Sequence, residues 1–311
     1  MLYMGKYDNY IIQIVSAGSL TKAAEALQIS QPALSLGLNK LEKRLGFKIF
    51  NRQTIPLCFT PEGKIYFDYI KKKQILQEDF KLRISTLWNE YNSKVVIGGP
   101  EVYTGGIVTG AVEKLLQLYP YFSVCIKSAS IGQLIDLSTK REVDCFISTT
   151  DKLPTNFVQI PVKKEKIYLC IPKKNSINNQ LQDYEISRSN AKSLTDFSFL
   201  NNEAFIYLED WQPLQKKLLT FFKQYSINPV NRVIVNQVCT MLNMSIITES
   251  ACIASEDALI CNGNIAQFCL YALPESMSNR LIYVAYEKDL YVSKATQELI
   301  KLLTKTGGAT K

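Results

Sequence analysis

The most constraining feature of this chain is the spacing of its apolar and small residues between Tyr10 and Glu62. Apolar side chains recur there at three- and four-residue steps in three successive segments, which is the period of one helix face. Ser19 and Ser30 are suited to cap the second and third segments, and Pro32 is tolerated in a first helical turn. The pattern predicts three short helices followed by a two-stranded wing.

The third predicted helix begins at Ser30-Gln31-Pro32 and ends at Gly46. We expect its buried face to consist of Ala33, Leu34, Leu38, Leu41 and Leu45. A helix-turn-helix of this kind places its outer face in the major groove of DNA. The predicted DNA contacts are Ser19, Thr21, Ser30, Gln31, Pro32, Ala33, Ser35, Leu36, Asn39, Lys40 and Arg52.

Two residues within this helix leave the mode of base recognition open. Leu36 is equally compatible with simple helix packing, and Gly37 costs about 1 kcal/mol relative to Ala while removing a possible contact. Direct contacts with bases are therefore expected from Gln31, Pro32 and Ser35. A larger part of the recognition is expected to depend on DNA shape and phosphate contacts.

The positive charge of the chain supports contact with phosphates. The formal net charge is +8, and half of that excess lies in residues 1–60, which contain seven basic and three acidic residues. Basic residues near a DNA-binding motif neutralise phosphates, although an ordinary solvated surface also carries charge.

The order and spacing of the residues in this region resemble those of the LysR-type transcriptional regulators. The matching positions are Gly18, Ser19, Leu20, Ala23, Ala24, Leu27, Ser30 through Ser35, Leu41, Glu42, Leu45, Gly46, Ile49, Phe50, Arg52, Thr60 and Gly63. The resemblance implies a cytoplasmic regulator that binds double-stranded DNA as a homodimer or homotetramer and is switched by a small-molecule effector. It also implies an α+β multidomain fold with a winged helix-turn-helix at residues 1–60.

A long helix is predicted over residues 61–91. Tyr66, Tyr69, Lys73, Leu76, Phe80, Arg83, Leu87 and Tyr91 follow one another at alternating three- and four-residue steps, and most are apolar. The resemblance assigns this linker helix to pairing between two subunits. Packing against the chain's own C-terminal part is the alternative.

From Ser93 onward, predicted strands alternate with helices, which favours βαβ units and a mainly parallel sheet. The second set of strands begins near Lys166. The resemblance implies an effector-binding domain at 92–305 with two α/β lobes, built like a periplasmic binding protein. The first lobe is predicted at 92–163 and 269–305, and the second at 164–268.

Loops at the carboxyl ends of the first three strands are the candidate effector site, because ligands of such sheets bind there. The residues are Pro100, Glu101, Tyr103, Thr104, Ser128, Ala129, Ser130, Ser148 and Thr149. Hydroxyls and helix N-termini suit an anion, but Glu101 would repel a simple carboxylate and admit an amine or zwitterion. Glu101 is equally compatible with a solvent-exposed surface position. Thr248 to Ser255 also departs from the family's glycine-rich turn.

Composition argues against an enzyme. The chain has no histidine, no C-x-x-C pair and no phosphate-binding glycine loop, so we expect no catalytic residues, no metal site and no cofactor. No run of 18 apolar residues and no secretory signal is present, so no membrane span is expected. Most of the eight cysteines lie in apolar strings and are expected to be buried in a reducing cytosol. A redox switch between Cys252 and Cys261 or between Cys261 and Cys269, or a degenerate effector domain without a ligand, is the alternative.

Overall fold

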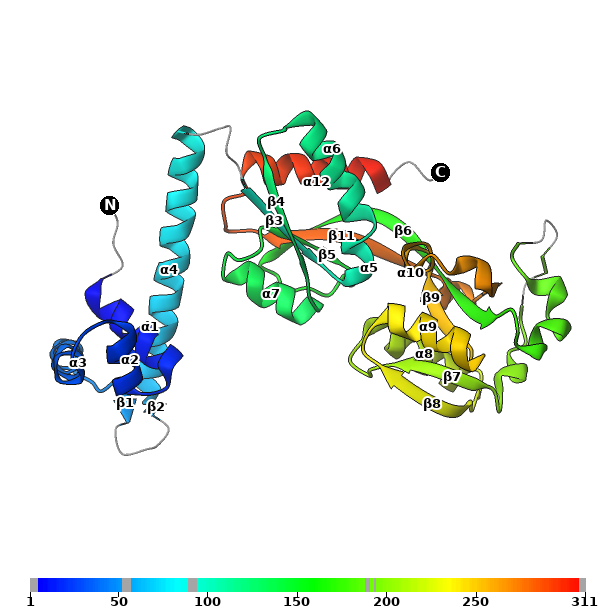
Figure 1. Cartoon of the computed structure of the whole chain (residues 1–311), viewed down its shortest axis with the longest axis horizontal. Coiled ribbons are helices and arrows are strands. Elements are labelled where there is room, and N and C mark those ends of the chain that lie inside the picture. Colours follow the sequence, from blue (N-terminus) through cyan, green and yellow to red (C-terminus); the bar gives the residue numbers. More distant parts are fainter. Residues whose placement is uncertain (1–4, 52–56, 89–93, 188–190, 193, 308–311) are drawn as a thin grey trace. The chain divides into compact units, whose positions relative to one another are not determined.

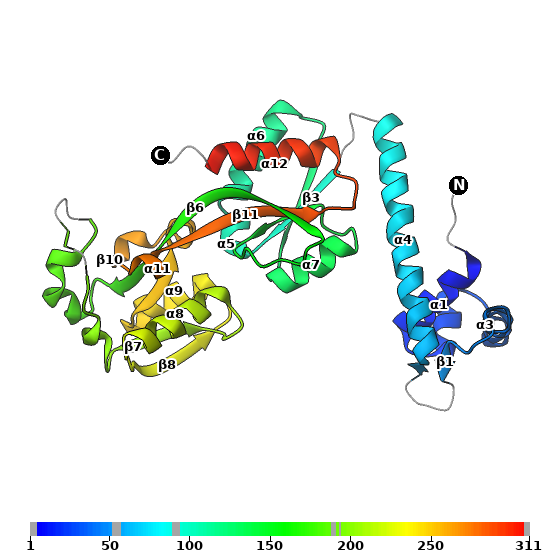
Figure 2. The same cartoon turned by 180° about the vertical axis from the view of Figure 1, so that it is seen from behind.

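The computed structural model describes residues 5–51, 57–88, 94–187, 191–192 and 194–307. It consists of two compact units, Met1–Trp88 and Asn89–Lys311. Figures 1 and 2 show the elements of each unit from opposite sides.

The N-terminal unit contains the predicted three helices, wing and long helix. The elements are α1 (Lys6–Ala17), α2 (Leu20–Ala26), α3 (Gln31–Leu45), β1 (Phe50–Asn51), β2 (Cys58–Phe59) and α4 (Pro61–Trp88), and β1 pairs antiparallel with β2. The Ser19 and Ser30 hydroxyls cap α2 and α3 by accepting from the backbone N–H groups of Lys22 and Ala33. Gly18 and Gly46 end α1 and α3 with φ of 67° and 80°, a left-handed conformation that favours glycine. The predicted three helices, wing and long helix are therefore present, although the last residues of the predicted long helix, 89–91, lie outside the described residues.

One apolar core joins α4 to the helix-turn-helix. Phe67 and Ile70 of α4 belong to the same buried cluster as Ile11 and Ile14 of α1. An ion pair of 2.7 Å between Lys73 Nζ and Asp8 Oδ2 adds a polar contact between α4 and α1. The first half of α4 is therefore part of the folded unit that holds α3.

The start of α4 is held by Thr60 and Gly63. The Thr60 hydroxyl donates to the carbonyl of Lys48 and accepts from the Gly63 N–H at 2.9 Å. A Cβ at position 63 would lie 1.9 Å from the Ile49 carbonyl oxygen, so the helix can approach the wing this closely only with glycine. This contact explains the Thr-x-x-Gly spacing seen in the sequence.

The first lobe of the C-terminal unit is a sheet covered on both faces. Its strands are β3 (Lys94–Gly99), β4 (Ser123–Ser128), β5 (Cys145–Ser148), the first part of β6 (Phe157–Pro172) and β11 (Asn279–Glu287). Its helices are α5 (Glu101–Thr104), α6 (Ile107–Leu118), α7 (Ile131–Thr139) and α12 (Lys294–Gly307), and α6 lies beside α12 on the face opposite α7 (Figure 1). Segment Glu101–Thr104, predicted as a loop, is helical.

The second lobe is built on the remaining part of β6. Antiparallel pairing joins that part to β9 (Cys252–Ser255) and β10 (Phe268–Ala272). A separate parallel pair is formed by β7 (Ala204–Leu208) and β8 (Val230–Val235). The helices are α8 (Pro213–Gln224), α9 (Val238–Thr248), α10 (Glu256–Asn262) and α11 (Glu275–Ser278), with short 3-10 turns at Ser176–Gln180, Gln182–Tyr184, Ser198–Leu200 and Ile265–Gln267.

Strand β6 is the main difference from the sequence prediction. It begins at Phe157 rather than near Lys166, and its two parts belong to different lobes. The strand order of the sheet that contains it is β10-β6-β11-β5-β3-β4. The parallel pairs are β3 with β4 and β5, and β7 with β8, whereas β6 and β11 pair antiparallel, so the prediction of a mainly parallel sheet is wrong. The lobe limit predicted at 163/164 falls within β6, and the limit predicted at 268/269 falls at the start of β10.

Candidate functional site

Helix α3 presents the predicted polar face to the outside. Gln31, Pro32, Asn39 and Lys40 are exposed, and Ser35 is half-buried. Ala33 is also exposed, so its assignment to the buried face is wrong, because the cluster inside is formed by Leu34, Leu38 and Leu41. Thr21 of α2 is exposed as well, while Arg52 lies outside the described residues.

Leu36 and Gly37 have separate structural explanations. Leu36 is 57% exposed, so the packing interpretation of this residue is wrong. A Cβ at position 37 would lie 2.7 Å from Cε2 of Tyr10, which is buried between α1 and α3. Glycine at this position therefore permits close contact between the two helices.

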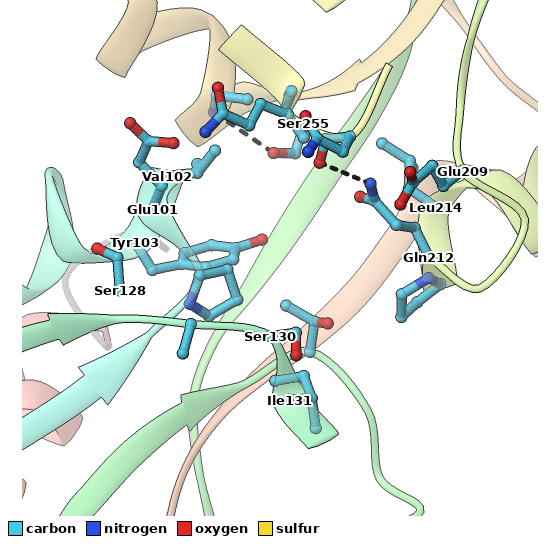
Figure 3. Close-up of a pocket in the computed structure, with 18 of the residues that line it drawn as sticks. Glu101, Val102, Tyr103, Ser128, Ser130, Ile131, Glu209, Gln212, Leu214 and Ser255 are labelled. Atoms are coloured by element: carbon cyan, nitrogen blue, oxygen red, sulfur yellow. Dashed lines mark hydrogen bonds between the residues drawn. The ribbon is translucent and has the colours of Figure 1, made fainter. Parts of the chain in front are cut away.

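The C-terminal unit contains a cavity of about 580 Å³, which lies in the range of small-molecule sites. Figure 3 shows side chains from both lobes around it. Of the predicted effector residues, seven line the cavity: Pro100, Glu101, Tyr103, Ser128, Ala129, Ser130 and Thr149. The other two, Thr104 and Ser148, are buried and are not part of its lining.

Most of the predicted hydroxyl donors are already engaged within the first lobe. Thr104 Oγ1 lies 2.9 Å from both Ser128 Oγ and the Glu101 carbonyl oxygen, and Thr104 ends α5 rather than starting a helix. Ser130 and Gln133 form a reciprocal capping box that closes the N-terminus of α7. Ser148 Oγ donates to the Thr150 carbonyl oxygen at 2.9 Å. The first lobe therefore offers fewer groups to an anion than its sequence suggests.

The sequence interpretation missed the wall contributed by the second lobe. Glu209 follows β7, Asn236 follows β8 and Ser255 ends β9, and all three line the cavity. Their positions at strand ends are the same signal that identified the residues of the first lobe. The further lining residues from this side are Trp211, Gln212, Pro213, Leu214, Gln237, Val238, Cys239 and Ala258. Strand β11 contributes Arg280 to the lining.

Beside the cavity lies a buried ionic cluster of Tyr103, Glu165 and Arg280. Glu165 Oε2 accepts from Arg280 Nε at 2.6 Å and from the Tyr103 hydroxyl at 2.8 Å. Burial lowers the pKa of Arg280, but its interactions with Tyr103 and Glu165 outweigh that effect and raise the pKa overall. Burial raises the pKa of Tyr103 well above its usual value, so the phenol stays protonated and donates. The Arg280 charge is neutralised by Glu165 within the protein.

The cysteines differ in exposure. Cys252 is fully buried opposite Cys170 of β6, whereas Cys261 is exposed. Burial raises the pKa of Cys239 and Cys269, which disfavours their reactive thiolate forms. Within the described residues, no group of three or more acidic or cysteine side chains could hold a metal ion. Every helix in the described part of the chain is too short or too polar to cross a membrane.

Two protein-family models match this chain. Residues 9–64 match the bacterial regulatory helix-turn-helix protein of the lysR family, and residues 89–308 match the LysR substrate binding domain. Among curated relatives, the HTH-type transcriptional regulator YcgK of Bacillus subtilis is 28% identical over 172 residues, covering 54% of this chain and 52% of YcgK. The chain spans about half the length of the first curated relatives that it matches.

Solved structures share the whole fold. A variant of full-length OxyR from Pseudomonas aeruginosa is 17% identical, with a TM-score of 0.65 over 97% of this chain and 95% of that one. Full-length CbnR complexed with its target DNA is 12% identical, with a TM-score of 0.66 over 98% of this chain and all of that one. This agreement confirms the predicted fold class of helix-turn-helix, linker helix and α/β domain. Since its two matched domains together cover most of its length, the chain belongs to the LysR family of bacterial regulatory proteins, which are not enzymes.

Proposed function

We propose that this protein is a cytoplasmic transcriptional regulator that binds duplex DNA through α3 and responds to a small polar effector held in the cavity. The observation that carries the DNA-binding part is the exposed face of α3, whose polar side chains are not used by the core of the N-terminal unit. The related fold of CbnR, solved with its target DNA, supports the same use of this unit.

Each exposed group on α3 has a distinct expected role. The Gln31 amide can pair with the edge of one base in the major groove. Lys40 can neutralise a phosphate, and the exposed Leu36 can contact a thymine methyl group. Ser19, Thr21, Ser30, Pro32, Ala33, Ser35, Asn39 and Arg52 complete the proposed interface.

Helix α4 supplies the proposed contact between two copies of the chain. Tyr69, Leu76 and Phe80 are 56%, 66% and 46% exposed, although they are large and apolar. Two other seam residues are used inside the unit, since Tyr66 contacts Phe47 and Lys73 pairs with Asp8. Tyr91, the last residue of the predicted seam, lies outside the described residues. A homodimer through the exposed positions would set two copies of α3 on a two-fold DNA site.

The DNA-binding proposal is tested with duplexes selected from random sequences by the full chain. We expect Gln31→Ala to lose about 1–3 kcal/mol of discrimination at one base pair per half-site. Lys40→Ala should weaken binding to all sequences alike and flatten its salt dependence. Both effects are measured by fluorescence anisotropy titrations at several salt concentrations.

The matched controls are Gln224→Ala and Lys223→Ala, which remove the same side chains from exposed positions of α8. These variants should bind DNA as the unaltered chain does. Unchanged specificity and salt dependence in both α3 variants would show that α3 is not the recognition element.

A further inference from the structure

We infer that the effector is a zwitterion, a molecule with a protonated amine and a carboxylate such as a free amino acid, held with its amine at Glu101 and its carboxylate at the start of α9. This inference rests on the proposed function of the cavity as the effector site. A zwitterion is the chemical class that can contact both walls of the cavity at once.

The amine position follows from the charges around the cavity. Glu101 is exposed on the first-lobe wall, and its carboxylate makes no hydrogen bond or ion pair with the described residues. Glu209 lies on the opposite side (Figure 3), where it accepts from the indole N–H of Trp211. Arg280 is the one basic side chain among the lining residues, and Glu165 neutralises it. The cavity wall therefore carries uncompensated negative charge that favours an ammonium group.

The carboxylate position follows from an uncapped helix. Helix α9 has 11 residues, and the side chain of its N-cap residue, Gln237, makes no capping hydrogen bond. Val238 and Cys239, in its first turn, line the cavity. Backbone N–H groups in a first turn have no partner within the helix, and together with the helix dipole they favour an anion. The corresponding position of α7 is closed by its capping box, so the second lobe holds the anion site.

The two positions face a common space. Burial, and after it the negative charge of Glu101, raises the pKa of the Cys239 thiol. Glu101 of α5 and Cys239 in the first turn of α9 both line the cavity. Glu101 belongs to the first lobe and Cys239 to the second, so a molecule that contacts both also connects the lobes.

The remaining lining accommodates an apolar side chain. Pro100, Ala129, Ile131, Leu214 and Ala258 contribute carbon surface, and Trp211 adds an aromatic ring. The volume of about 580 Å³ exceeds the space needed for an amine and a carboxylate alone. A plain carboxylate would meet the Glu101 charge, and a plain amine would leave the α9 N–H groups without a partner.

The test uses the full chain and three matched sets of probes: the twenty amino acids, the amines made by removing their carboxylates, and the acids made by removing their amines. Thermal shift identifies binding, and calorimetry measures affinity. At least one amino acid is expected to bind more than tenfold tighter than its matched amine and its matched acid. No binding by any amino acid, or equal affinity for the matched acid, would overturn the inference.

Two variants separate the two contacts. Glu101→Gln should weaken amino-acid binding at least tenfold, whereas Glu113→Gln, an exposed change on α6, should leave it unchanged. Gln237→Asp supplies an internal anion at the start of α9, so it should weaken amino-acid binding at least tenfold without lowering the melting temperature of the free protein. Unchanged affinity in both variants would contradict the assigned pose.

Failure of this inference is distinguishable from failure of the proposed function. A chain that selects specific DNA but binds no amino acid remains a regulator with a different effector. A chain that binds amino acids but selects no DNA sequence contradicts the regulator proposal instead.

Discussion

At the scale of single residues, glycines decide how closely the elements approach. Ala is favoured over Gly by about 1 kcal/mol within a helix, yet a Cβ at position 37 would lie 2.7 Å from the Tyr10 ring. Tyr10 is buried and packs edge-on against Tyr7, so its ring has little room to move. We expect Gly37→Ala to lower the free energy of unfolding by about 1–3 kcal/mol, measured by urea denaturation.

The control for this prediction is Gly110→Ala in α6, where a Cβ would meet no atom within 4 Å. That change should raise the free energy of unfolding by about 1 kcal/mol through helix propensity alone. Equal stabilisation by both substitutions would show that Tyr10 moves aside at no cost.

At the scale of elements, strand β6, which both lobes share, contributes Glu165 to the buried ionic cluster. Glu165 is 1% exposed and holds Arg280, whose side chain is 14% exposed. Glu165→Gln preserves the shape but leaves the Arg280 charge buried without its carboxylate. Removing one partner of a buried pair costs about 3–5 kcal/mol, so the urea midpoint of the C-terminal unit should fall markedly.

The neighbouring change Lys164→Gln, at an exposed position of the same strand, should alter the free energy of unfolding by less than about 0.5 kcal/mol. The double variant Glu165→Gln with Arg280→Gln should recover part of the loss, because no uncompensated charge remains. A Glu165→Gln protein as stable as the Lys164→Gln control would refute the role assigned to the pair.

At the scale of the whole molecule, the exposed apolar positions of α4 determine the expected assembly. Leu76→Asp combined with Phe80→Asp would place charges inside a two-helix interface at a cost of several kcal/mol. Light scattering should then report single chains of 35.3 kDa, and binding to the selected DNA should weaken sharply. Gln74→Asp, an exposed change two residues from Leu76 and so on a different side of α4, should leave both unchanged. A double variant that keeps the mass of the unaltered assembly would rule out pairing through these positions.

The N-terminal unit was predictable in detail because its signals are local. Helix periods, the serine caps of α2 and α3, and the glycines that end α1 and α3 depend on residues within about four positions of one another. The same local signals predicted that strands alternate with helices from Ser93 onward. They failed for β6, since periodicity alone does not show that one strand continues through two sheets.

The sequence by itself determined the helix-turn-helix, the polar face of α3, the apolar positions of α4 and seven residues of the cavity. Tertiary structure alone decided the rest. The Arg280–Glu165 contact joins residues 115 positions apart, and that of Arg280 with Tyr103 joins residues 177 apart. The need for glycine at position 37 depends on Tyr10 of another helix. Such contacts depend on the path of the chain between distant segments, and residue spacing carries no record of that path.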